Sequence, residues 1–163
     1  MQNSILFRKQ NSIKLILGTA LLVGTLDISA AFLNSYIRAD VSPIIVLQFI
    51  ASGLIGDPSF EGGILTALLG LVLHYFIALA WTFIDFYFIS KINFTAKYKY
   101  SAGLLYGIFI WLIMNLVVVP LSNTPVLHLD SVQKLIGISF IIFLIGLPIS
   151  IMYHKYNKES YPG

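Results

Sequence analysis

The sequence predicts an all-α polytopic membrane protein, with four transmembrane helices in a bundle and one short helix on the outer side. Of its 163 residues, 58% are hydrophobic and only 10% are charged, whereas soluble domains carry roughly 25% charged residues. Four apolar runs meet the length of roughly 17–25 residues that a transmembrane helix needs. Positive residues gather at the ends of these runs. A chain of this length and character forms one domain, which spans residues 1–163.

The first span is expected at about 13–37, and a short helix follows at about 43–55. Pro43 suits the first position of that helix, after Ser42 as its N-cap. Gly53 and Gly56 supply stop signals. The helix is too short to cross a bilayer, so it lies in the interface or is re-entrant.

Three further spans are expected, at about 62–90, 101–121 and 134–153. Pro120 follows the third of these, and Gly146, Leu147 and Pro148 interrupt the fourth. A proline lacks the backbone N–H that a helix needs, so the fourth span is expected to be kinked there.

The positive residues predict the orientation in the membrane. Of the ten Lys and Arg residues, only Arg38 and Lys134 lie in the two outer connections. The others lie in the two tails and in the connection after the second span, at Arg8, Lys9, Lys14, Lys91, Lys97, Lys99, Lys155 and Lys158. Because cytoplasmic loops carry the excess of Lys and Arg, both termini are expected in the cytoplasm. The positive charge thus indicates orientation in a lipid bilayer, and no nucleic acid is expected as a partner.

The N-terminal run has a second interpretation, as a cleaved signal peptide. Arg8 and Lys9 precede an apolar segment, and Ser29, Ala30 and Ala31 resemble a cleavage site. Asp27 argues against cleavage, as does the apolar run that continues beyond the proposed cut. Retention as a transmembrane helix is therefore favoured.

Asp27 is the most informative residue, because it lies in the middle of the first apolar run. A carboxylate at the centre of a spanning helix costs at least about 2.5–3.5 kcal/mol. Two polar residues of other spans, His74 and Asn115, are candidate partners. Counting about 1.5 Å per residue places all three in the outer half of the bilayer, within one or two helical turns of each other.

Polar and small residues recur at intervals of three or four, which predicts helix faces turned to the bundle interior. Such small residues let neighbouring helices approach closely. Asp85, near the cytoplasmic boundary, is expected to pair with Lys91 or to be solvated. The stripes are Ala20, Gly24, Asp27, Ala31 and Asn34 in the first span, Gly63, Ala67, Gly70, His74, Ala78, Trp81 and Asp85 in the second, and Gly103, Gly107, Trp111 and Asn115 in the third.

These positions lead to a hypothesis of small-solute or proton handling. Asp27 and His74 would form the ionisable centre, with Asn115 and Gln48 lining the path. Four spans are few for a pathway, so a homodimer is expected. The alternative is an accessory protein whose small-residue stripes pack against a partner membrane protein, with the polar cluster purely structural.

An enzyme is disfavoured, because no HExxH, GxSxG or Walker motif is present. Cys ligands are excluded, since the chain has no cysteine. A bis-histidine haem site would need two histidines in mid-membrane, and only His74 qualifies. No cofactor or metal is expected.

Several segments resemble a family of small, largely uncharacterised bacterial inner-membrane proteins with four helices. The resemblance covers about residues 17–149 and implies a bacterial plasma-membrane protein whose motifs include His74 and Asn115. No activity or catalytic residue is established for that family, so no role is transferred. The matching segments are Ser42–Pro43, Val46–Gly53, Leu69–His74, Met114–Asn115, Val119–Ser122 and Gly146–Ile149.

Overall fold

The computed structural model describes residues 2–89, 98–125 and 130–160, and over these residues it is all-α. The longer helices are α1 (Gln2–Ala39), α2 (Pro43–Ile55), α3 (Gly63–Ile84), α5 (Lys99–Ile113), α7 (Ser131–Phe140) and α8 (Leu147–Ser160). Shorter elements are the 3-10 helix η1 (Asp57–Phe60), the π-helical turns η2 (Asp85–Ile89), η3 (Met114–Val118) and η4 (Ile141–Gly146), and α6 (Val119–Leu121).

The predicted four spans are confirmed within a few residues at each described boundary. Helices long and apolar enough to cross a membrane cover Ser12–Ala39, Gly63–Phe88, Lys99–Leu121 and Ser131–Lys155. The predicted end of the second span, residue 90, lies outside the described residues. The protein is therefore a membrane protein built on four helices.

The short helix α2 begins and ends as predicted. Pro43 occupies its first turn, and Ser42 before it is extended but makes no side-chain capping bond. Gly56 ends the helix with a φ of 71°, a left-handed value that glycine adopts without a steric penalty. Gly53 is not a stop signal but lies within the helix, where its carbonyl accepts a hydrogen bond from the backbone of Asn123.

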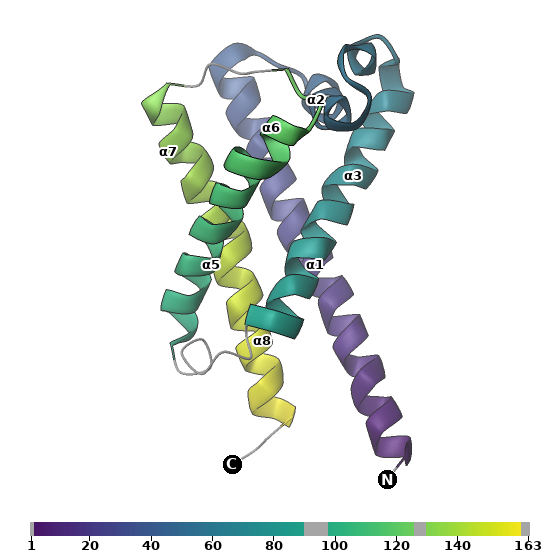
Figure 1. The fold of residues 1–163 in the computed structure, drawn as a ribbon, viewed down its shortest axis with the longest axis vertical. Helices are drawn as coiled ribbons and strands as arrows, with labels where there is room; N and C mark the ends of the chain where they lie inside the picture. The colour runs from purple at the N-terminus through teal and green to yellow at the C-terminus, as the bar shows by residue number, and fades with distance from the viewer. Residues whose placement is uncertain (1, 90–97, 126–129, 161–163) are drawn as a thin grey trace.

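The spans form two helix pairs (Figure 1). In one pair α1 packs mainly against α3, and in the other α5 packs mainly against η4 and α8. Contacts of α1 with η4 and α8 join the pairs, whereas α3 and α5 have few close backbone contacts. Both chain termini lie at one end, here called the terminus end, and α2 lies against α3 at the opposite α2 end.

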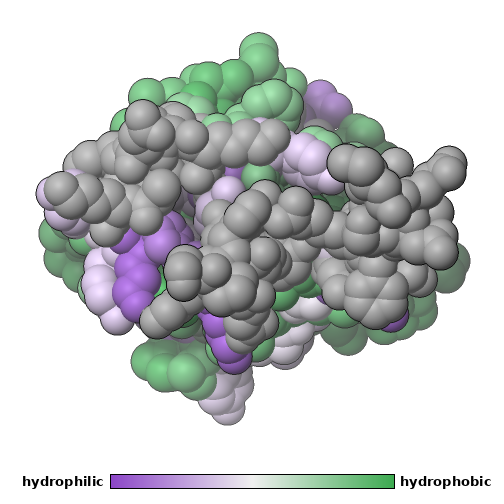
Figure 2. All heavy atoms as spheres, turned by 90° about the horizontal axis from the view of Figure 1, so that it is seen from below, coloured by the Kyte–Doolittle hydropathy of each residue, from purple (hydrophilic) through white to green (hydrophobic). Residues whose placement is uncertain are grey.

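Large apolar side chains cover the outside of the spans. Leu21, Leu65, Phe76, Leu116 and Phe143 are each more than half exposed. Seen from the terminus end, hydrophobic residues surround the sides of the molecule (Figure 2). A surface of this kind suits the hydrocarbon of a bilayer.

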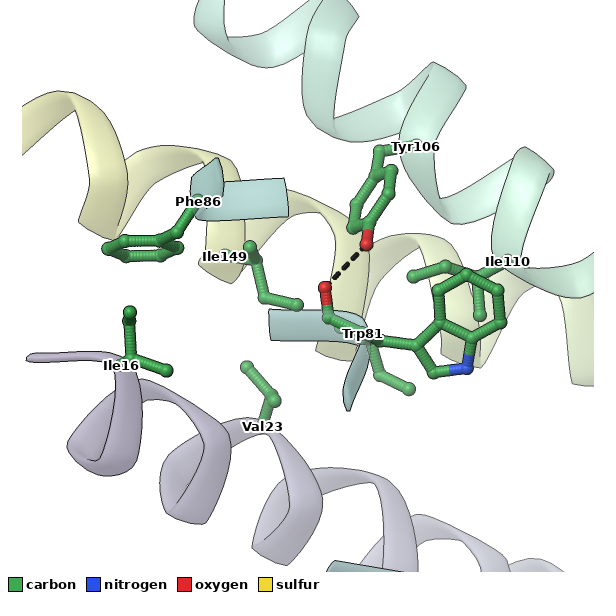
Figure 3. Packing of buried hydrophobic residues seen from close by; sticks show 8 residues of the cluster. Ile16, Val23, Trp81, Phe86, Tyr106, Ile110 and Ile149 are labelled. Carbon is green, nitrogen blue, oxygen red and sulfur yellow. Dashed lines mark hydrogen bonds between the residues drawn. The ribbon is translucent and has the colours of Figure 1, made fainter. Parts of the chain in front are cut away.

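Buried side chains fill the bundle from its middle toward the terminus end (Figure 3). The hydroxyl of Tyr106 donates a hydrogen bond to the carbonyl oxygen of Trp81 at 2.5 Å, which links α5 to α3. This bond joins two helices whose backbones come close at few points, and the ring of Trp81 also packs edge-to-face against Tyr106 and Phe109. The core comprises Ile16, Val23, Trp81, Phe86, Tyr106, Ile110, Ile145 and Ile149.

Glycines bring α5 and the fourth span into backbone contact. A Cβ on Gly107 would lie 2.6 Å from the Cα of Ile142, and one on Gly103 would lie 2.8 Å from the Cα of Leu147. From the other side, a Cβ on Gly146 would collide with the carbonyl oxygen of Gly103. This pair of helices is thus held by close packing of small residues, as membrane helices often are.

Two of the π-turns precede prolines. Pro120 follows η3 and Pro148 follows η4, and the residues four positions earlier, Leu116 and Leu144, lie inside those turns. A proline ring clashes with the carbonyl four residues before it, and a local π adjustment relieves the clash while keeping the backbone bonded. The kink expected near Pro148 takes the form of a π-turn.

The predicted interior stripes of the first two spans are confirmed, apart from Gly63, which is exposed. Asp85 is only 2% exposed, so its interpretation as a solvated charge is wrong. Lys91, its expected partner, lies outside the described residues. Among the other stripe members, Ala20, Gly24, Ala67, Gly70, Ala78 and Trp81 are buried, and Asp27, Ala31, Asn34 and His74 are half-buried.

Replacing Gly107 by Ala tests the contact between the helices of the second pair. We expect Gly107→Ala to lower the free energy of unfolding by about 1–3 kcal/mol, because the new methyl group overpacks against a backbone. The matched control is Gly18→Ala, since no atom lies within 4 Å of a Cβ at that exposed helical position. Denaturant unfolding in detergent measures both variants. Equal stabilities would contradict the packing described above.

Candidate binding site between the two helix pairs

A cavity of about 370 Å³ lies between the helix pairs, and both Asp27 and His74 line it. Its wall takes residues from α1, α2, α3, α5, η3, α7 and η4. Most of the wall is apolar, as at Ile50, Met114 and Phe140. The two residues that the stripes predicted to meet therefore reach one shared space.

The cavity is closed on one side by the core. Trp81, Ile110 and Ile145 belong to both the cavity wall and the buried cluster below it. In the opposite direction the wall continues to Asn34 and Ser35, near the α2 end of α1. The polar part of the wall thus extends toward the α2 end, and apolar packing separates it from the terminus end.

Asp27 presents its carboxylate to this cavity. Among the described residues, no hydrogen bond or ion pair to the Asp27 side chain is found. His74 lines the same cavity but forms no ion pair with Asp27. A carboxylate inside a membrane protein needs a partner. The partner of Asp27 would lie in the cavity.

His74 is held by the first span. Its Nε2 lies 2.8 Å from the carbonyl oxygen of Gly24. A carbonyl oxygen can only accept a hydrogen bond, so Nε2 carries a proton and donates it. The neutral imidazole of His74 is therefore the tautomer with its proton on Nε2.

Neighbouring contacts fix His74 in this position. A Cβ on Gly24 would lie 2.9 Å from the ring of Tyr75, so only glycine lets α3 come this close to α1. Thr25 donates its hydroxyl proton to the carbonyl of Leu21 at 2.7 Å, and it therefore accepts from the Tyr75 hydroxyl at 2.9 Å. Both helices are thereby joined at the level of the site.

Gln48 does not line the cavity, contrary to expectation. It is 4% exposed, and its amide donates to the carbonyl of Gly63 at 3.0 Å and reaches the hydroxyl of Thr66 at 3.4 Å. These bonds fasten α2 to the first turn of α3. The residue of α2 that faces the cavity is Ile50, two positions further along.

Asn115 is the second correction. Its side chain is exposed on the outside of the bundle and donates to the carbonyl of Trp111 on its own helix at 2.9 Å. The predicted stripe fails because it advances by four residues at every step. A helix turns about 100° per residue, so three such steps carry Asn115 about 120° away from Gly103.

The stripe of the second span puts Trp81 on an interior face, but no sequence pattern assigns Trp81 or Phe140 to the site. Both aromatic side chains contribute to the cavity wall. Their apolar character resembles ordinary core packing, so no pattern in the sequence distinguishes them. Trp81 could have been selected by its distance from His74, seven residues or about two helical turns away on the same face.

A second buried carboxyl group, that of Asp85, lies beyond the core residues that close the cavity. Asp85 lies beside Tyr106, whose hydroxyl holds the Trp81 carbonyl. Trp81 and Tyr106 therefore separate two acidic residues, Asp27 on the cavity side and Asp85 toward the terminus end.

No group of three or more His, Cys, Asp or Glu residues that could hold a metal ion occurs in the described part of the chain. No protein-family model matches the sequence, and comparisons with curated proteins and with solved structures found no match. The resemblance to uncharacterised bacterial membrane proteins stays a prediction. Function must be argued from the chemistry of the cavity.

The histidine geometry can be tested by nitrogen NMR of ¹⁵N-histidine-labelled protein. We expect the neutral ring of His74 to be the Nε2-protonated tautomer, because Nε2 donates to the carbonyl of Gly24. His74→Gln serves to assign the signal. A neutral His74 with its proton on Nδ1 would contradict the hydrogen bond.

Proposed function

We propose that this protein handles a small solute or protons in the bacterial plasma membrane, with Asp27 and His74 as the polar centre of its cavity. The observation that carries the proposal is the Asp27 carboxylate, which faces the cavity without a hydrogen-bonding neighbour among the described residues. A carboxyl group that only joins helices would be bonded to another helix, because an unsatisfied polar group in a membrane costs several kcal/mol.

The arrangement of the helix pairs also supports transport. The cavity extends toward the α2 end and is blocked toward the terminus end by Trp81 and the core around it. The two pairs are packed tightly within themselves but touch each other less. A relative movement of the pairs that parts Trp81 from Tyr106 would connect the cavity to the terminus end.

The membrane location and orientation belong to the same proposal. The distribution of Lys and Arg favours cytoplasmic termini, so the cavity would extend toward the periplasmic side. We propose a non-enzymatic role, because the site pairs a carboxylate and an imidazole with apolar walls, and the sequence carries no catalytic motif.

One observation favours a second candidate function, in which the chain associates with another membrane protein or with a second copy of itself. Asn115 is exposed on the outside of a span, six residues before the end of α6, where lipid would surround it. An amide in hydrocarbon gains by bonding across a helix interface. A homodimer through this face is compatible with transport, because the four spans of one chain are few for a transport pathway.

Flux measurements in proteoliposomes test the transport proposal, with proton uptake followed by an enclosed pH-sensitive dye. We expect pH-dependent flux for the parent protein and its loss in Asp27→Asn and His74→Ala, with unchanged thermal midpoints. Asp57→Asn is the matched control, because Asp57 is an exposed carboxylate outside the cavity. Parental flux in both variants, or no flux of protons or of any solute tested, would refute the proposal.

The association proposal is tested by cysteine crosslinking, for which the chain offers a cysteine-free background. If a second copy covers Asn115, mild oxidation of Asn115→Cys in membranes will give a crosslinked dimer. Leu135→Cys is the control, since Leu135 is 65% exposed on a different span. Equal crosslinking of both variants would show that the Asn115 face is no preferred interface.

A further inference from the structure

We propose that the cavity takes an organic cation with an apolar body, such as a substituted ammonium or phosphonium ion. This inference rests on the proposed function in that it assumes the cavity binds a ligand, and it names the chemical class. It follows from three properties of the wall: its charge, its apolar surface and its size.

The wall carries one carboxylate, that of Asp27, and one imidazole, that of His74. Among the described residues of the wall there is no other Asp or Glu and no Lys or Arg. The Nε2 proton of His74 is donated to the Gly24 carbonyl, so it does not bond to the carboxylate. A buried carboxylate is stabilised by an opposite charge close to it, so a cationic ligand would supply what the described side chains do not.

The remaining surface suits a body that is poorly hydrated. Trp81 and Phe140 offer aromatic rings, and Ile50, Met114 and Ile141 add aliphatic contacts. Aromatic faces attract organic cations by about 0.5–2 kcal/mol. A divalent metal ion would instead need several oxygen ligands, and no cluster of candidate metal ligands occurs among the described residues.

The size is appropriate for a small molecule. About 370 Å³ lies within the range of ligand pockets, which span about 300–1,000 Å³. The space is also wider than a proton pathway requires. A wall with a carboxylate at Asp27 and aromatic rings from α3 and α7 would orient a ligand that has one cationic centre and apolar substituents.

The chain provides a fluorescent reporter for this site. It has two tryptophans, and Trp111 is not part of the cavity wall. Trp111→Phe therefore leaves Trp81 as the single tryptophan, in the wall itself. The probe is methyltriphenylphosphonium, and its neutral counterpart of similar shape is triphenylphosphine oxide.

We expect the cation to quench Trp81 saturably in Trp111→Phe and to bind at least about tenfold more tightly than the neutral compound, as one charge-assisted contact predicts. Adding Asp27→Asn should weaken cation binding by about tenfold or more and leave the neutral compound unaffected. Asp57→Asn should bind like the parent. Equilibrium dialysis with the unsubstituted protein checks the same affinities without the reporter.

Three outcomes would overturn the inference: no saturable cation binding, equal affinity for the two compounds, or undiminished cation binding in Asp27→Asn. Equilibrium dialysis compares the two compounds in the unsubstituted protein, so this comparison decides even if Asp27→Asn fails to fold. Binding without any flux would refute transport and leave the ligand class standing. Asp27-dependent proton flux without cation binding would refute the ligand class and leave the proposed function standing.

Discussion

The structure depends on how helices attract one another in a solvent that is as apolar as their side chains. Lipid gives no hydrophobic reason for helices to associate, so close packing and a few hydrogen bonds must suffice. Glycines supply the close packing within each pair, at Gly24 against Tyr75 and at Gly107 against Ile142. No comparable contact joins α3 to α5, where the Tyr106–Trp81 hydrogen bond bridges the gap. The cavity lies where close packing is missing.

This placement explains why one acidic residue can be both costly and useful. Asp27 shares a face with the residues that join α1 to α3, yet it lies just beyond their contact and meets open space. His74 on α3 donates its Nε2 proton to the carbonyl of Gly24, which lies three residues before Asp27 on α1. The same helix interface thus holds His74 in place and leaves Asp27 beside it, facing the cavity.

The fold could be predicted from the sequence because bilayer thickness converts apolar length directly into spans, and Pro43 and Gly56 bracket α2. The meeting of Asp27 and His74 was predictable because their stripes mix steps of three and four, which keeps to one face. Asn115 and Gln48 were misplaced for different reasons. A constant step of four drifts around the helix, and the partners of Gln48, Gly63 and Thr66, depend on how α2 folds back. Tertiary packing of this kind leaves no periodic trace in the sequence.

The π-turns set the register of part of the cavity wall. Met114 opens η3, and Ile141 and Ile145 belong to η4, so these wall residues lie in segments whose backbone hydrogen bonds span one residue more than those of an α-helix. Shifting such a turn by one position rotates the side chains it passes by about 100° while the backbone stays hydrogen-bonded. By fixing the position of these turns, Pro120 and Pro148 therefore also determine which apolar side chains a bound molecule would meet.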